Sequence, residues 1–247
     1  MQHIVIIGAT SSMAEHCARL WVQATTVRLT LVGRDDVRTS RVADDLRVRS
    51  PQSHIEVMTS DFLHASAIQN TVKTIVAQSA VDVVLIAHGV LSDQPTCQDD
   101  VLACDDALQI NGVSPVLFAE AFAKSMSAAN NGTIAIIGSV AGDRGRKTNY
   151  VYGAAKGLVS RYAQGMQHRL AHTNVKVVLI KPGPTDTPMT SDLKAKGQKM
   201  ASVEQVAQDI VKGIAAGNPV VYTPGIWEII MLVVMHLPRV IINKLNI

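Results

Sequence analysis

The chain has 247 residues, of which 47% are hydrophobic and 17% charged, and its formal net charge is +3. This length and apolar content suit one large domain with a substantial core, and the near balance of acidic and basic side chains argues against nucleic acid as a partner. Three cysteines (Cys17, Cys97 and Cys104) show no paired spacing, and no secretory leader precedes the first apolar run, so we expect a reduced, cytoplasmic protein.

Seven short runs rich in Val, Ile and Leu predict β-strands. They cover residues 3–7, 28–32, 54–58, 82–87, 133–138, 175–180 and 219–222. Polar residues do not alternate with apolar ones in these runs, which is typical of strands buried on both faces. Such strands need helices on both sides of a parallel sheet, so the sequence predicts a doubly wound α/β fold.

Longer stretches with helical periodicity separate the strands. They include residues 11–24, 65–79 and 202–217, and in the last of these Ser202 is a candidate N-cap and Gly217 a candidate end of the helix. We find no internal repeat, low-complexity tract or flexible linker. The prediction is therefore a single domain, with a body over 1–225 and an apolar helical tail over 226–247 that belongs to the same domain.

The turn after the first strand reads GATSSMAEHCARL and leads into a helix, which is where the pyrophosphate of a dinucleotide meets a helix N-terminus. Its residues that would face a cofactor are Gly8, Thr10, Ser11, Ser12 and Met13. Of the three glycines usual at such a site only Gly8 is present, because Ser12 and Ala14 occupy the other two places. Taken alone, the turn fits an ordinary strand-to-helix connection equally well.

The second strand ends in LVGRDD, at the point where a dinucleotide-binding fold contacts the adenosine ribose. Gly33 leaves space there, and the guanidinium of Arg34 offers two parallel donors to a 2′-phosphate. This pattern favours NADP(H). Asp35 keeps NAD(H) open as the less favoured cofactor, because a carboxylate can accept hydrogen bonds from the ribose hydroxyls. A solvated surface position for Arg34 is the remaining alternative.

Four polar residues around the fifth strand suggest proton-transfer chemistry. Ser139 follows that strand, Tyr152 and Lys156 come next, and Asn111 lies in the preceding helical segment. Residues four apart share one face of a helix, so Tyr152 and Lys156 should project into the same space. A tyrosine has an ordinary pKa of about 10, and a nearby ammonium would lower that pKa toward neutrality. We therefore expect Tyr152 to act as an acid or base with Lys156 as its activator.

These motifs, taken in order, resemble the short-chain dehydrogenase/reductase family almost from end to end. The matching elements are the turn at Gly8, Asp61 in TSDF, AHG at 87–89, Asn111, Ser139, YGAAK at 152–156 and PGPTDT at 182–187. The sequence departs from the family pattern at Ile7, Ser12, Ala14 and His88. The resemblance implies a Rossmann-type NADP-binding catalytic domain over 1–225.

The resemblance also implies a role for each matching residue. Tyr152 would donate a proton to a substrate carbonyl that Ser139 orients. Lys156 would hold the nicotinamide ribose and lower the tyrosine pKa, and Asn111 would hold a water that links the lysine to solvent. The cofactor would be contacted by Asp61 and Phe62 at the adenine, by Ala87, His88 and Gly89 along the adenosine, and by Pro182, Gly183, Thr185 and Thr187 at the nicotinamide. No metal site is expected, and the pair His168 and His172 is interpreted as an exposed polar face.

Two segments bear on the substrate. The loop GDRGRKTNY carries Arg144, Arg146 and Lys147, which form either a solvated charged loop or a site for a phosphate or carboxylate. The tail has an apolar run over 226–235, then Pro238 and two basic residues. That run is too short to cross a bilayer, which needs about 20 apolar residues. It would therefore lie on a membrane surface, or pack on its own subunit or on a partner in a homo-oligomer.

A softer resemblance of the tail is to bacterial short-chain reductases of polysaccharide and lipid-linked sugar synthesis, including relatives of the enzyme that reduces the keto sugar of a polyprenyl-phosphate pentose. The family resemblance implies an NADPH-dependent reductase that interconverts a ketone and a secondary alcohol on a small-molecule carbonyl substrate. The resemblance of the tail adds a lipid- or phosphate-linked keto sugar as the substrate and a place at the inner face of the membrane. Two alternatives stay open, namely a 3-oxoacyl-type ketoreductase and a non-catalytic nucleotide-binding regulatory or scaffold protein.

Overall fold

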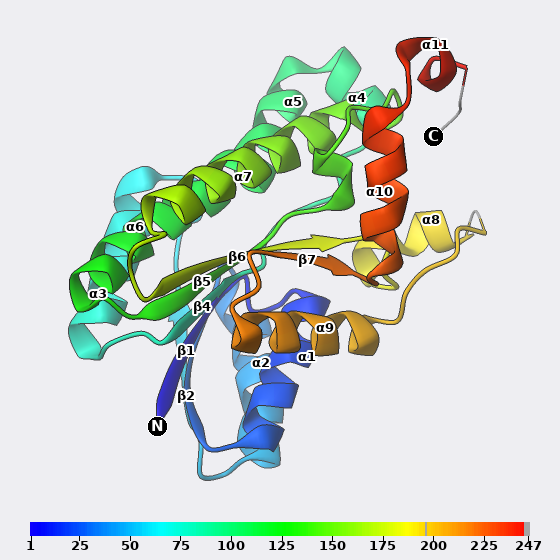
Figure 1. The fold of residues 1–247 in the computed structure, drawn as a ribbon. Coiled ribbons are helices and arrows are strands. Elements are labelled where there is room, and N and C mark those ends of the chain that lie inside the picture. Colours follow the sequence, from blue (N-terminus) through cyan, green and yellow to red (C-terminus); the bar gives the residue numbers. More distant parts are fainter. Residues whose placement is uncertain (196, 245–247) are drawn as a thin grey trace.

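The computed structural model of the chain describes residues 1–195 and 197–244, and within them seven strands form one parallel sheet (Figure 1). The strands are β1 (Gln2–Ile7), β2 (Val27–Gly33), β3 (His54–Thr59), β4 (Val83–Ile86), β5 (Gly132–Ile137), β6 (Val175–Pro182) and β7 (Val220–Thr223). Each lies within one or two residues of its predicted run. The predicted doubly wound α/β fold, a Rossmann-type sheet in a single domain, is confirmed.

Helices cover both faces of the sheet, as the apolar strands require. One face packs against α1 (Ser12–Ala24), α2 (Asp36–Arg49) and α9 (Val203–Ala216), and the other against α3 (Ala65–Gln78), α6 (Ser114–Ala129) and α7 (Tyr150–Arg169). Successive residues of β1 divide between the two cores, with Ile4 and Ile6 in one and Val5 and Ile7 in the other. Both sets are fully buried, which explains why the strand sequence shows no polar alternation.

The strand order is β3-β2-β1-β4-β5-β6-β7, so the direction of winding reverses between β1 and β4. In an open α/β sheet, ligands bind outside the carboxyl ends of the strands at this reversal.

Helix α9 begins and ends where the sequence predicts. The side chain of Ser202 accepts a hydrogen bond from the N–H of Gln205, and Gly217 ends the helix with a left-handed φ of 65°.

The remaining elements lie around the carboxyl ends of the strands. They are α4 (Gln94–Asp99), α5 (Val101–Leu108), a π-helical turn (Gln109–Val113), two 3₁₀ turns (Val140–Gly142 and Pro188–Thr190), α8 (Ser191–Ala195), α10 (Ile226–His236) and α11 (Arg239–Ile242). In Figure 1, α10 stands beside the ends of β6 and β7, and α11 continues beyond it. Within residues 1–195 and 197–244, no helix combines the length and the apolar content that crossing a membrane requires.

Candidate active site

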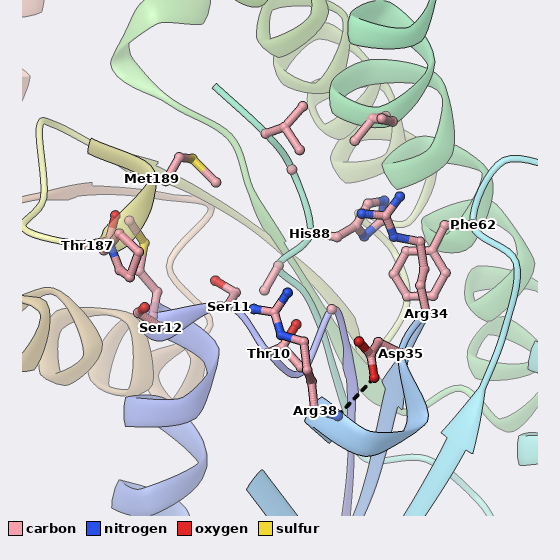
Figure 2. Close-up of a pocket in the computed structure, with 18 of the residues that line it drawn as sticks. Thr10, Ser11, Ser12, Arg34, Asp35, Arg38, Phe62, His88, Thr187 and Met189 are labelled. Carbon is pink, nitrogen blue, oxygen red and sulfur yellow. Dashed lines mark hydrogen bonds between the residues drawn. The ribbon is translucent and has the colours of Figure 1, made fainter. Parts of the chain in front are cut away.

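A cleft of about 580 Å³ opens at the carboxyl ends of β1, β2 and β4, where the winding reverses (Figure 2). Twelve residues predicted to contact a cofactor line it, namely Gly8, Thr10, Ser11, Ser12, Met13, Gly33, Arg34, Phe62, Ala87, His88, Gly89 and Thr187. Asp35, Arg38, Leu63, Val90, Ile110, Pro188 and Met189 complete the lining. A single cleft thus collects side chains from segments that are far apart in the sequence.

The turn between β1 and α1 presents an open helix N-terminus to this cleft. Gly8 has a φ of 84°, and a Cβ atom there would lie 2.7 Å from the Cβ of His88, so only glycine fits. Among the described residues, the hydroxyl of Ser11 caps none of the first N–H groups of α1. Those N–H groups, together with the hydroxyls of Thr10 and Ser12, suit the phosphates of a dinucleotide.

The turn departs from the three-glycine pattern at Ser12 and Ala14, and the structure explains each departure differently. Ser12 is half-buried and begins α1 at the edge of the cleft, where a hydroxyl is compatible with a phosphate. Ala14 is fully buried in the core between α1 and the sheet, so its methyl group fills space on the side of the helix that packs against the fold. Neither residue blocks the cleft.

The adenosine end of the cleft carries two guanidinium groups. Arg34 follows β2 directly, and Arg38 lies four residues later in α2 (Figure 2). Asp35 caps α2, since its carboxylate accepts a hydrogen bond of 3.0 Å from the N–H of Arg38. Arg38 was not predicted, although its spacing from Arg34 in the sequence is the signal that could have found it.

Gly33 has a different role from the one we expected. A Cβ atom at this position would lie 2.0 Å from the hydroxyl of Thr39, which is fully buried and donates to the backbone oxygen of Asp35. The glycine therefore allows the first turn of α2 to pack onto the end of β2. The space beside Gly33 is taken by Thr39, and the cations of Arg34 and Arg38 remain the feature that would contact a 2′-phosphate.

His88 stands where the family pattern has asparagine, and it packs as a neutral side chain. Its Nε2 atom lies 2.8 Å from the hydroxyl of Ser114, and its ring makes edge contacts with Phe62 and Phe118 at centroid distances of 4.8 and 5.7 Å. Burial lowers the pKa of His88 to about 3, and the charges of Lys156 and Arg34 act in the same direction. The imidazole thus joins the segment after β4 to α6.

The four predicted catalytic residues come together beside this cleft. Ser139 follows β5, Tyr152 and Lys156 lie in the first turns of α7, and the side chains of Ser139 and Tyr152 are hydrogen-bonded. The ammonium of Lys156 lies 5.8 Å from the centre of the Tyr152 ring. A Cβ atom on Gly89 would lie 2.9 Å from Oδ1 of Asn111 and 3.7 Å from Nζ of Lys156, which places both groups against the cleft wall.

The electrostatics of Tyr152 differ from our expectation. Burial raises its pKa above the usual value, while the hydrogen bond from Ser139 opposes that rise. The ammonium of Lys156 points to the main chain and donates a 3.0 Å hydrogen bond to the carbonyl of Ile137, and burial lowers the pKa of Lys156 to about 8. In this arrangement burial is the largest influence on the pKa of Tyr152, Ser139 opposes it, and the phenol is protonated at neutral pH.

Asn111 is fully buried in the π-helical turn between α5 and α6. Its Oδ1 atom accepts from the N–H of Val90 at 2.9 Å, and its Nδ2 atom donates to the carbonyl of Ala107 at 2.9 Å. The amide side chain therefore ties the segment after β4 to this turn. A water relay between Asn111 and Lys156 stays a prediction.

Six residues predicted to contact the cofactor lie outside the described lining of the cleft, namely Asp61, Tyr152, Lys156, Pro182, Gly183 and Thr185. The carboxylate of Asp61 accepts from the N–H of Leu63 at 2.7 Å and pairs with His64, and Leu63 lines the cleft in its place. Pro182, Gly183 and Thr185 are buried at the end of β6, where the hydroxyl of Thr185 donates to the carbonyl of Gly183. Thr187 is the member of this segment that reaches the cleft.

The loop between Ser139 and Tyr152 is held by a buried ion pair and by a contact with α10. Asp143 forms a 2.6 Å ion pair with Lys181 and accepts a 2.9 Å hydrogen bond from the hydroxyl of Tyr222. Arg144 donates to the carbonyls of Val234 and Met235, both at 2.8 Å, and so caps the end of α10. Only Nη1 of Arg144 binds these carbonyls, so the interpretation of this residue as part of an anion site stays a prediction.

Comparisons with known proteins agree with this geometry. The model of the short chain dehydrogenase family matches residues 2–198. An uncharacterised oxidoreductase of Streptomyces coelicolor is 25% identical over 98% of this chain and 95% of its own, and one of Mycobacterium tuberculosis is 26% identical over 98% and 96%. A short-chain dehydrogenase from Sphingobium yanoikuyae, solved in complex with NADPH, has the same fold, with a TM-score of 0.83, 20% identity and coverage of 97% of both chains.

The family model covers most of the chain, and the full-length relatives carry the name oxidoreductase. The fold, the cleft at the reversal of winding and the clustered Ser139, Tyr152 and Lys156 are what a nicotinamide-dependent enzyme of this kind requires. The chain belongs to the short-chain dehydrogenase family and is an NAD(P)-dependent oxidoreductase.

Proposed function

We propose that this protein is an NADPH-dependent reductase that converts a ketone to a secondary alcohol. The observation that carries the proposal is the half-buried, protonated phenol of Tyr152, hydrogen-bonded to Ser139 and with the ammonium of Lys156 5.8 Å from its ring centre. Reduction of a carbonyl needs a proton donor at the oxygen, and a protonated phenol is in the correct state at neutral pH. The nicotinamide cofactor, when bound, supplies the hydride.

The chain's own residues position and protonate the substrate. Tyr152 donates its hydroxyl proton to the carbonyl oxygen, and the hydroxyl of Ser139 orients that oxygen. One N–H of the Lys156 ammonium donates a hydrogen bond to the carbonyl of Ile137, and the other two remain as donors for a ribose hydroxyl. Asn111 fixes the segment at Gly89 and Val90 on which the cofactor would rest. This set supports turnover over a non-catalytic binding role.

Replacing Tyr152 by phenylalanine tests the catalytic assignment. We expect Tyr152→Phe to reduce the rate of ketone reduction about 100- to 10,000-fold, because it removes the proton donor and leaves the ring in place. Binding of NADPH, followed by quenching of its fluorescence, should persist. The matched control is Tyr150→Phe, whose ring is 45% exposed at the start of α7. Equal loss in both variants, or full activity of Tyr152→Phe on a panel of ketones, would contradict the proposal.

We infer a preference for NADP(H) over NAD(H) from the charges at the adenosine end of the cleft. Arg34 and Arg38 line it together, and Asp35 is bound to the N-terminus of α2. Two guanidinium groups favour a 2′-phosphate, while a carboxylate already accepting a backbone hydrogen bond is less suited to the ribose hydroxyls. The affinities of Arg34→Asp for the two cofactors measure this preference.

We propose that the substrate is anionic, and that a lipid- or phosphate-linked keto sugar is the class that fits. The support is Arg146, which is half-buried in the loop before Tyr152 and has no ion-pair partner within the described residues. Burial without a counter-charge lowers the pKa of this guanidinium. A phosphate on the substrate would supply the missing charge, and the exposed ammonium of Lys147 adjoins it in the sequence.

The variant Arg146→Gln tests the anionic substrate. We expect its KM for a phosphorylated ketone to rise about tenfold or more, since a hydrogen bond to a charged group is lost, while kcat changes little. The KM for a neutral ketone should be unaffected. Arg161→Gln, at an exposed position of α7, is the control. A similar rise in KM for neutral and phosphorylated ketones would remove Arg146 from substrate recognition.

A further inference from the structure

Helix α10 turns an apolar face outward, which is the reverse of the usual pattern for a surface helix. The exposed large hydrophobic side chains of this region, here called the apolar outer face, are Ile226, Ile229, Ile230, Leu232, Val233 and Met235 on α10 and Val240 and Ile241 on α11. Isolated exposed apolar residues are ordinary, but a contiguous group marks a surface that contacts something apolar.

This face is fixed by the contacts on the opposite side of α10. Met231 is buried, and a Cβ atom on Gly183 would lie 2.0 Å from Nε1 of Trp227, so the indole lies directly on the end of β6. Arg144 binds the carbonyls at the other end of the helix. Both ends of α10 are therefore anchored to the body, beside the ends of β6 and β7 (Figure 1). The apolar outer face remains exposed.

A second copy of the chain has another exposed apolar surface available to it. Val101 and Leu102 on α5 and Leu158 on the adjoining α7 are also exposed, and they offer the predicted homo-oligomer a separate surface.

The charges around α10 complement an anionic surface. Arg239 and Lys244 follow its C-terminal end, and the loop held there by Arg144 also carries Arg146 and Lys147. Within the described part of the tail, Glu228 is the acidic side chain of α10 and lies near the opposite end. A short helix with an apolar side and basic residues at one end is suited to the headgroup region of a membrane.

We propose that the apolar outer face docks onto the surface of an anionic phospholipid bilayer, with α10 lying on the membrane. Docking in this way brings the loop between Ser139 and Tyr152 close to the headgroups, because Arg144 joins that loop to α10. The proposal extends the proposed function, since a lipid-linked substrate would then be reached from the bilayer surface. The docking step itself depends on no part of the reductase chemistry.

Sedimentation with vesicles of phosphatidylcholine and phosphatidylglycerol in equal amounts tests this docking, and it needs neither cofactor nor turnover. We expect the full-length protein to bind these vesicles and the double variant Ile229→Glu/Val233→Glu to lose at least about tenfold in binding. Removing charge with Arg239→Gln/Lys244→Gln should weaken binding by about fivefold for each residue, and added salt should weaken wild-type binding.

The control is Val48→Glu, which places the same charge at an 83% exposed position of α2. Circular dichroism and thermal unfolding establish that each variant is folded. The proposal is overturned if wild-type protein does not bind the vesicles, or if Ile229→Glu/Val233→Glu binds as well as Val48→Glu. It is also overturned if the double variant abolishes a dimer of the wild type in sedimentation velocity and leaves vesicle binding unchanged. A failed reductase assay would bear on the proposed function alone.

Discussion

At the scale of single residues, burial decides the chemistry of this site more than neighbouring charge does. Lys156 is buried and Tyr152 and His88 are half-buried, and for each of them desolvation is the largest cause of the pKa shift. Burial disfavours the charged form of every group, so it keeps the phenol and the imidazole neutral and makes the ammonium easier to deprotonate. The sequence shows which groups meet, but the loss of water around them depends on the assembled core.

The lowered pKa of His88 has a measurable consequence for the pH dependence of stability. Its pKa falls from 6.5 to about 3 in the folded protein, so on acidification the unfolded chain takes up a proton before the folded one does. Stability from this group is complete above pH 6.5 and is lost as the pH falls toward 3, by about 2 kcal/mol between pH 7 and pH 5. We expect urea unfolding of His88→Asn to show a smaller loss over that interval than wild type, and exposed His172→Asn to match wild type. Equal losses in all three would contradict the buried, neutral imidazole.

At the scale of elements, the segment between β5 and α7 is held in place by charges that lie inside the fold. Asp143 and Lys181 have side chains only 4% and 8% exposed, and the hydroxyl of Tyr222 binds both of them. The network joins the loop that follows Ser139 to β6 and β7. Burial and the nearby Asp143 raise the pKa of Tyr222, so the phenol acts as a neutral donor in this network.

Removing one charge of this network should destabilise the protein strongly. In Asp143→Asn the ammonium of Lys181 stays buried without a counter-charge, which costs about 3–5 kcal/mol. The double variant Asp143→Asn/Lys181→Met removes both charges and should recover much of that loss. The exposed pair of Arg47 and Asp44 supplies the control, since Asp44→Asn is expected to change stability by less than about 1 kcal/mol. Equilibrium urea unfolding measures all three, and a loss in Asp143→Asn no larger than in Asp44→Asn would contradict the network's role.

At the scale of the whole molecule, the fold could be predicted from local patterns, while several site residues could not. Continuous apolar runs determine buried parallel strands, and Ser202 and Gly217 show where α9 begins and ends, because each of these signals depends on neighbouring residues. The hydrogen bonds from Arg144 to α10 and the packing of Trp227 on Gly183 join residues more than 40 positions apart, so no local pattern predicts them. Arg38 combines a local and a long-range signal. Its spacing from Arg34 can be read in the sequence, but the direction of its side chain depends on how α2 packs.

The cofactor cleft also connects distant parts of the molecule, so its occupation should stabilise the fold as one unit. Its lining comes from β1, β2 and β4 and from the segment at Thr187, on both sides of the reversal in winding. A ligand present at 100 times its Kd adds about 2.7 kcal/mol to the stability of the folded state. With an unfolding entropy of about 2 cal/mol/K per residue, this corresponds to a rise in Tm of about 5 °C.

We therefore expect NADPH to raise the Tm of wild-type protein by this amount in a single transition, and NADH at the same concentration to raise it less. Arg34→Asp should lose most of the response to NADPH, because the contact with the 2′-phosphate is replaced by repulsion between like charges. Arg41→Asp makes the same change of charge at an exposed position of α2 that does not line the described cleft, and should respond like wild type. Calorimetry with both cofactors measures these shifts. Equal shifts with NADH and NADPH, or an unchanged response in Arg34→Asp, would show that the 2′-phosphate is not recognised at this end of the cleft.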